Sequence, residues 1–110
     1  MNYPEPYGLE CNDGWKSIIN DTHRKLKYID PDYKISQIKE KFGGLRYYAD
    51  GHVDEQMDGM IDMAEALSYT ICEECGQPGK LRSGGWMRTL CDKHEEERQA
   101  RYKEMNLERL

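Results

Sequence analysis

The stretch CEECGQPGKLRSGGWMRTLCDKH, residues 72–94, decides how the carboxy-terminal part of the chain folds. It contains two close pairs of side chains that can bind a metal, Cys72-x2-Cys75 and Cys91-x2-His94, with fifteen residues between the pairs. A two-residue gap allows one tight turn to direct both side chains of a pair at the same ion, and two such pairs flanking a loop of about 12 to 20 residues are typical of tetrahedral zinc sites. The spacing therefore predicts one structural Zn2+ per chain, bound by Cys72, Cys75, Cys91 and His94.

The residues around the two pairs predict the local structure of this module. Gly76 follows the first pair and can adopt the positive φ that such a turn tends to need. Extended runs on both sides of Ser83-Gly84-Gly85 predict a β-hairpin. Residues 92–110 lack Gly and Pro and are rich in Glu, Lys, Arg, Gln and Ala, which predicts a helix that begins at the second pair. A knuckle, a hairpin and a helix in this order are typical of a treble-clef-like zinc finger.

Other interpretations of the cysteines fit the pattern less well. Two disulfides would require Cys11 to pair with one of the other three and would leave His94 without a role. A catalytic zinc normally has three protein ligands and an open position, whereas four ligands are available here. Cys11 could replace His94 as the fourth ligand, although the two-residue spacing favours His94; otherwise Cys11 is a free thiol.

The first 70 residues predict a helix–β-hairpin–helix body, so the fold class is α+β. Residues 1–12 contain two Pro and a Gly and are expected to form an irregular arm. Apolar residues recur at helical spacing over 15–29, with Asp13 as a candidate N-cap and Asp30-Pro31 as the end. A second amphipathic helix is predicted over 53–69.

Between the two helices, apolar and polar residues alternate over 33–50, on both sides of Phe42-Gly43-Gly44, and this pattern predicts a β-hairpin. Its register is open, because Ile35 and Ile38 cannot lie on one face of an unbulged strand. The chain is thus divided into a body, residues 1–70, and a zinc module with its helix, residues 71–110.

Composition limits the classes of function. Only 37% of the 110 residues are hydrophobic and 34% are charged, so a metal ion would supply stability that the small core lacks. A net charge of −5 is unusual for a protein that coats nucleic acid, and favours protein partners. Neither a signal peptide nor an apolar stretch of membrane-spanning length is present, which predicts no membrane association and a cytoplasmic protein. No nucleophile accompanies His23 or His52, so we expect no enzyme, with a cryptic nuclease left open.

Two groups of basic and aromatic residues are candidates for binding a partner. The unusual run over 39–46 could be a hairpin turn with solvated lysines, or a loop that contacts an acidic partner or phosphate. Trp86 could be an exposed interface anchor or could cover the metal. The C-terminal helix has few apolar residues and could form a homodimer, bind another protein, or be a frayed tail. The candidate partner-binding residues are Lys39, Lys41, Phe42, Arg46, Arg82, Trp86 and Arg88.

Three blocks of sequence resemble a family of small uncharacterised phage and bacterial zinc-finger proteins. The blocks are QIKEKFGGLRYY over residues 37–48, CEECGQPG over 72–79 and TLCDKH over 89–94. The resemblance covers roughly residues 14–96 and implies a small zinc protein of accessory, phage-related origin, without catalytic residues.

The sequence therefore predicts a zinc-stabilised, phage-encoded accessory protein that binds a host or phage protein as an adaptor or inhibitor. The alternative is a nucleic-acid-binding regulatory protein that uses the loop 39–46 and the zinc hairpin.

Overall fold

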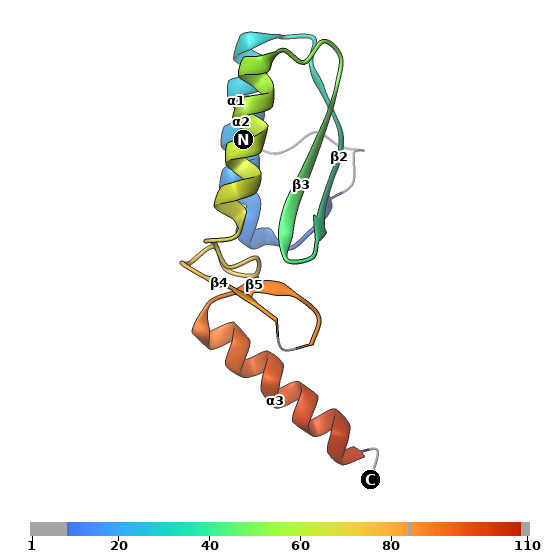
Figure 1. Ribbon diagram of the computed structural model, residues 1–110, viewed down its shortest axis with the longest axis vertical. Coiled ribbons are helices and arrows are strands. Elements are labelled where there is room, and N and C mark those ends of the chain that lie inside the picture. Colours follow the sequence, from blue (N-terminus) through green and yellow to red (C-terminus); the bar gives the residue numbers. More distant parts are fainter. Residues whose placement is uncertain (1–8, 84, 109–110) are drawn as a thin grey trace.

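A computed structural model of the chain describes residues 9–83 and 85–108, and it confirms the α+β class (Figure 1). Two helices lie side by side against a three-stranded sheet, and a small two-stranded sheet connects this body to a long final helix. In chain order the elements are β1 (Leu9–Glu10), the 3-10 turn η1 (Asp13–Trp15), α1 (Lys16–Ile29), β2 (Lys34–Lys41), β3 (Gly44–Asp50), α2 (Glu55–Ser68), β4 (Lys80–Arg82), β5 (Arg88–Leu90) and α3 (Asp92–Glu108).

The start of the first helix differs from the prediction. Asp13 is not an N-cap: it begins the 3-10 turn η1, and no side chain caps either η1 or α1. The turn is shaped instead by a distant contact, because Gly14 donates its backbone N–H to the carbonyl of Glu73 at 2.6 Å. This contact places Trp15 inside the core, where its ring is fully buried.

The predicted hairpin is present, and its register explains how two isoleucines share a face. The pairing of β2 with β3 shifts between Ile35 and Gln37, and this bulge lets Ile35 and Ile38 both point inward, each 1% exposed. The expectation of a wholly irregular arm was wrong at its end, because Leu9–Glu10 forms β1 and pairs in parallel with β2. Residues 1–8 of that arm lie outside the described residues.

The second helix begins two residues later than expected. Asp54 is its N-cap and accepts a hydrogen bond from the Met57 backbone N–H at 2.9 Å. Side chains of α2 also cover the outer edge of β3: Ser68 Oγ accepts from the Leu45 N–H at 2.9 Å, and Glu65 accepts from the Tyr47 N–H at 2.9 Å. These bonds occupy strand amides that would otherwise be open.

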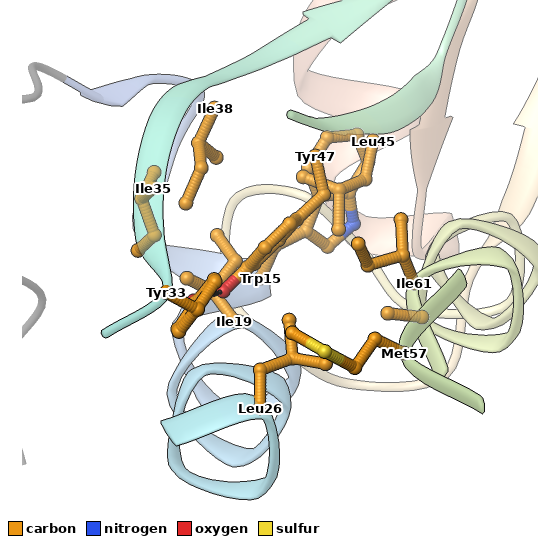
Figure 2. Close-up of a cluster of buried hydrophobic side chains, with 11 residues drawn as sticks. Trp15, Ile19, Leu26, Tyr33, Ile35, Ile38, Leu45, Tyr47, Met57 and Ile61 are labelled. Carbon is orange, nitrogen blue, oxygen red and sulfur yellow. Dashed lines mark hydrogen bonds between the residues drawn. The ribbon is translucent and has the colours of Figure 1, made fainter. Parts of the chain in front are cut away.

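The core lies between the inner face of the sheet and the two helices (Figure 2). Within it, His23 Nδ1 is hydrogen-bonded to the hydroxyl of Tyr33 at 2.7 Å, and that hydroxyl is in turn hydrogen-bonded to Tyr47. Burial raises the pKa of Tyr33 to about 12 and lowers the pKa of His23. The buried apolar residues are Trp15, Ile19, Leu26, Tyr33, Ile35, Ile38, Leu45, Tyr47, Met57, Ile61 and Ala64.

The helix α3 extends away from the body, so the molecule is elongated, with principal extents of 55 × 25 × 21 Å (Figure 1). Its radius of gyration is 16.0 Å, whereas a compact chain of this length would have about 13 Å. The predicted helix over 92–110 is confirmed to Glu108, and its last two residues lie outside the described part of the chain. None of the described helices is long and apolar enough to cross a bilayer.

Candidate metal centre

The four residues that the sequence pairs predict as ligands come together at one point. One ligand atom each from Cys72, Cys75, Cys91 and His94 lies within 4.8 Å of all the others, and no other such cluster occurs among the residues that the structure describes. The Cys75 and Cys91 sulfurs are 3.8 Å apart. The Nδ1 atom of His94 lies 3.2 Å from the Cys91 sulfur and 3.5 Å from the Cys72 sulfur. This arrangement is a Cys3His cluster that can hold a metal ion.

The first pair of ligands sits on a tight knuckle. Gly76 donates its N–H to the Cys72 carbonyl at 2.9 Å, and Cys72 donates to the Gln77 carbonyl at 2.7 Å. Gly76 has a φ of +81°, as predicted for a residue that closes such a turn. Its backbone conformation therefore brings the two cysteine side chains to the same side.

The second pair of ligands joins the hairpin to the final helix. Cys91 lies between the last residue of β5 and the first of α3, and its carbonyl accepts the N–H of Glu95 at 3.0 Å. His94 is in the first turn of α3, so the side chains at these two positions share one face of the turn. The direction of α3 is thereby tied to the cluster.

The backbone around Cys72 favours its thiolate. Burial opposes ionisation, but hydrogen bonds from the backbone of Cys91, Cys75 and Glu74 outweigh it and lower the pKa of the Cys72 thiol to about 7. Thiolates are the form that binds metal, and a bound cation would neutralise the negative charge that three neighbouring sulfurs accumulate.

Two acidic residues between the first ligands support the cluster, and sequence reasoning did not assign them a role. Glu74 lies 3.6 Å from Nε2 of His94, the ring nitrogen that faces away from the sulfurs, and 3.3 Å from Arg88. A carboxylate at the second nitrogen of a metal-binding histidine fixes the orientation of its ring. The pattern Cys-Glu-Glu-Cys contains no local feature that distinguishes these carboxylates from solvated ones.

Glu73 connects the cluster to the body. It is 4% exposed, its carboxylate lies 3.3 Å from Arg88 and accepts the Asn12 N–H at 3.2 Å. Its backbone accepts from Gly14 and donates to the Thr89 carbonyl at 3.0 Å. Desolvation raises the pKa of Glu73 despite these partners. We call this set of contacts among Asn12, Gly14, Glu73, Arg88 and Thr89 the joint.

The seven predicted partner-binding residues fall into two groups. The structure brings their two hairpins together, since the Thr89 hydroxyl of β5 donates to the Gly43 carbonyl at the tip of the β2–β3 hairpin at 2.7 Å. Arg82 and Arg88 form ion pairs within the chain: Arg82 pairs with Asp92 at 2.8 Å, and Arg88 belongs to the joint. The residues left on the surface or at its edge are Lys39, Lys41, Phe42, Arg46 and Trp86.

Trp86 and Cys11 differ in their surroundings. Trp86 is 68% exposed, so most of its side chain faces solvent, and its carbonyl accepts a hydrogen bond from Arg98. Cys11 lies outside the ligand set and packs against the hydrophobic core. Burial raises the pKa of the Cys11 thiol to about 12, which disfavours its thiolate form.

No family model, curated protein or solved structure matches this chain.

Proposed function

We propose that the cluster binds one zinc ion in a closed structural site, and that the chain is a zinc-stabilised accessory protein that binds another protein. The observation that carries the metal assignment is the spacing of the ligand atoms. For Zn–S bonds of about 2.3 Å and Zn–N bonds of about 2.0 Å, a tetrahedron separates two sulfurs by roughly 3.8 Å and sulfur from nitrogen by roughly 3.5 Å. The separations of 3.8 and 3.5 Å match these values, the separation of 3.2 Å is about 0.3 Å shorter, and all four ligand atoms lie within 4.8 Å of one another.

A closed site favours a structural role over a catalytic one. A catalytic zinc keeps a position open for water, and here four protein ligands would fill the tetrahedron. The ligands come from the knuckle and from the start of α3, so the ion would hold the helix to the hairpin. The contacts of Glu73 then connect the hairpin and the helix to the body. We infer that the metal organises a binding surface rather than reacting with a substrate.

Exposed aromatic side chains and a projecting helix favour a protein partner. Exposed aromatic side chains on the two hairpins, Phe42 at 60% and Trp86 at 68%, are of the kind that anchors protein interfaces. The polar helix α3 extends from the body and offers a further surface, either to a partner or to a second copy. In line with the resemblance described above, we propose that the chain is phage-encoded and acts as an adaptor or inhibitor of a host or phage protein.

The nucleic-acid alternative is weakened by the ion pairs of the zinc hairpin. Arg82 and Arg88 were expected to extend a basic surface, but their charges are matched by Asp92, Glu73 and Glu74. A gel-shift titration between about 50 and 200 mM salt tests this alternative, because binding through phosphates weakens steeply over that range.

The metal assignment is tested by elemental analysis of the untagged protein after dialysis. We expect one zinc per chain in the wild type and in Cys11→Ser, which changes a cysteine outside the ligand set. Cys91→Ser should lose the metal, and chelation of the wild type should lower its melting temperature. A chain that contains no stoichiometric metal, or that melts identically with and without chelator, would refute the proposal.

A further inference from the structure

The outer face of the three-stranded sheet carries a cluster of positive charge. The register of β2 and β3 places Lys39 directly opposite Arg46, and Lys41 lies on the same face two residues along β2. The neighbouring residues Ile38 and Leu45 point to the core and are buried, and Glu40, which lies between the two lysines, accepts the Gly43 N–H at 2.7 Å. Among the residues that the structure describes, α1 and α2 both lie on the other side of the β2–β3 hairpin (Figure 1), and Tyr69 reaches this side only at Gly44 and Arg46. We call Lys39, Lys41, Arg46, Tyr48 and the adjoining Phe42 the basic face.

Lys39 and Arg46 place two like charges opposite each other on β2 and β3, although Glu65 also attracts Arg46. Like charges directly opposite each other destabilise an antiparallel pair. Among the side chains that the structure describes, which exclude that of Glu10, no carboxylate lies within ion-pair distance of either lysine: Lys39 lies over the ring of Tyr48 at 5.9 Å, and Lys41 over the ring of Phe42 at 5.6 Å. In the β1–β2 register Glu10 is the partner position of Lys39. The far end of the hairpin differs, because Lys34 is opposite Asp50 there.

The third cation is held in place. Arg46 donates to the carbonyl of Leu45 at 3.2 Å, and a hydrogen bond with Tyr69 raises its pKa. Tyr69 can approach because Gly44 has no side chain: a Cβ there would lie 2.2 Å from the tyrosine ring. A guanidinium fixed in this way loses little entropy when it binds a carboxylate.

Phe42 adds a second, independent feature at the end of this face. Phe42 and Gly43 form a two-residue turn in which both have positive φ, 54° and 86°, as a type I′ turn requires. Asn, Asp or Gly normally occupies the first position, because a bulky side chain in the left-handed region is strained. The Phe42 side chain is nevertheless 60% exposed, so burial in the core does not explain its presence. Strain of this kind persists at sites that bind ligands.

We propose that the basic face binds an acidic segment of a partner protein, with carboxylates between Lys39, Lys41 and Arg46 and an apolar side chain against Phe42 and Tyr48. This inference rests on the proposed protein-binding function and assigns it a surface and a partner chemistry. Three cations match a short acidic segment, whereas a nucleic-acid strand usually engages many more phosphates. The acidic residues that flank the cluster along the chain, such as Asp50, would repel a continuous polyanion.

The proposal is tested by titrating isotopically labelled, zinc-loaded protein with a short peptide of glutamates around a central phenylalanine. We expect amide shifts concentrated in β2 and β3 and binding that weakens with added salt. The matched peptide with glutamines should not bind. Lys39→Ser combined with Lys41→Ser should weaken binding about tenfold, since two exposed ion pairs contribute roughly 1.4 kcal/mol together. Lys34→Ser, on the same strand but opposite Asp50, is the matched control and should bind as the wild type does.

Three results would overturn this assignment. Equal binding of the glutamine peptide would remove the role of charge, and shifts centred on α1 or α3 would place the surface elsewhere. Preferential binding of an oligothymidine of similar length at the same face would show that the face recognises phosphate.

Capture from bacterial lysate separates this inference from the proposed function. A stoichiometric partner that the double variant loses, that Lys34→Ser retains and that the glutamate peptide displaces would support both. A partner retained equally by the double variant would leave the protein-binding function standing and refute the basic face. Failure of the wild type to retain any partner would count against the protein-binding function, whatever the peptide titration shows.

Discussion

Replacing Gly14 with alanine tests how closely η1 packs against the knuckle at the joint. A Cβ at this position would lie 2.1 Å from the Cys72 carbonyl oxygen and 2.3 Å from the Glu73 carbonyl oxygen, both backbone atoms that cannot rotate away. Because ordinary contacts of this kind are no shorter than about 3.4 Å, η1 and the knuckle must separate by roughly 1 Å. That shift would disrupt the hydrogen bond from Gly14 to Glu73 at 2.6 Å and the bond from Trp15 Nε1 to the Ile71 carbonyl at 3.0 Å.

The magnitude follows from these two bonds. Loss of each hydrogen bond leaves a partly buried carbonyl without a donor and lowers the free energy of unfolding by about 1–2 kcal/mol. The unfolded chain has less entropy with alanine than with glycine, which offsets this loss by about 0.4–1 kcal/mol. We expect Gly14→Ala to lower the free energy of unfolding by about 2–3 kcal/mol, which corresponds to a fall in melting temperature of roughly 10 °C. The variant should also bind zinc more weakly, because the clash reaches the backbone of a ligand.

Gly59→Ala is the matched control for this experiment. Gly59 is inside α2 and an added Cβ would meet nothing within 4 Å, so the better helix propensity of alanine should raise the free energy of unfolding by about 0.5–1 kcal/mol. Urea titrations of both variants, monitored by circular dichroism with zinc present, give the two values. If Gly14→Ala proves as stable as the wild type while Gly59→Ala behaves as expected, η1 does not pack against the knuckle and the joint is misassigned.

Three further changes test other parts of the structure. His23→Gln should lose less stability than the wild type when the pH falls below 7. Burial lowers the pKa of folded His23 below its unfolded value near 6.5, so the unfolded chain takes up the proton first and acid destabilises the wild type. Urea titrations of both proteins at neutral and mildly acidic pH measure the two losses, and equal losses would contradict the burial of this ring. Phe42→Gly should raise the free energy of unfolding by about 0.5–1 kcal/mol by relieving the left-handed backbone, and should weaken binding of the glutamate peptide; a destabilised variant would mean that Phe42 is not strained. Thr89→Val should destabilise by about 1–3 kcal/mol, because a buried carbonyl at the hairpin tip loses its donor, and a neutral result in thermal melts would argue against contact between the hairpins.

Local pattern was sufficient to predict the longer helices, the two hairpins and the four side chains of the Cys3His cluster. The two x2 pairs identified Cys72, Cys75, Cys91 and His94 because a turn of that length constrains both side chains at once. The conflict between Ile35 and Ile38 indicated an irregular strand, and the structure resolves it with a bulge.

The contacts that the sequence did not predict are those between distant residues. Asp13 resembles an N-cap, but the geometry of η1 is set by Glu73, which lies 60 positions further along the chain. Arg82 and Arg88 were expected on a partner surface, but both form ion pairs with carboxylates of the same chain. The sequence could not reveal these pairs, because the carboxylates become neighbours of the arginines only after the knuckle and α3 have folded. The strand β1 depends in the same way on pairing with β2, and two residues carry too little pattern to reveal it.

The extension of α3 away from the body affects how the mass of this protein in solution should be measured. A rod-like particle diffuses more slowly than a sphere of equal mass, so a single chain will leave a gel-filtration column early when the column is calibrated with round standards. An early elution volume would therefore imitate the homodimer that α3 could form. Light scattering or sedimentation equilibrium can distinguish one chain from two, because both methods give the molecular mass independently of the shape of the particle.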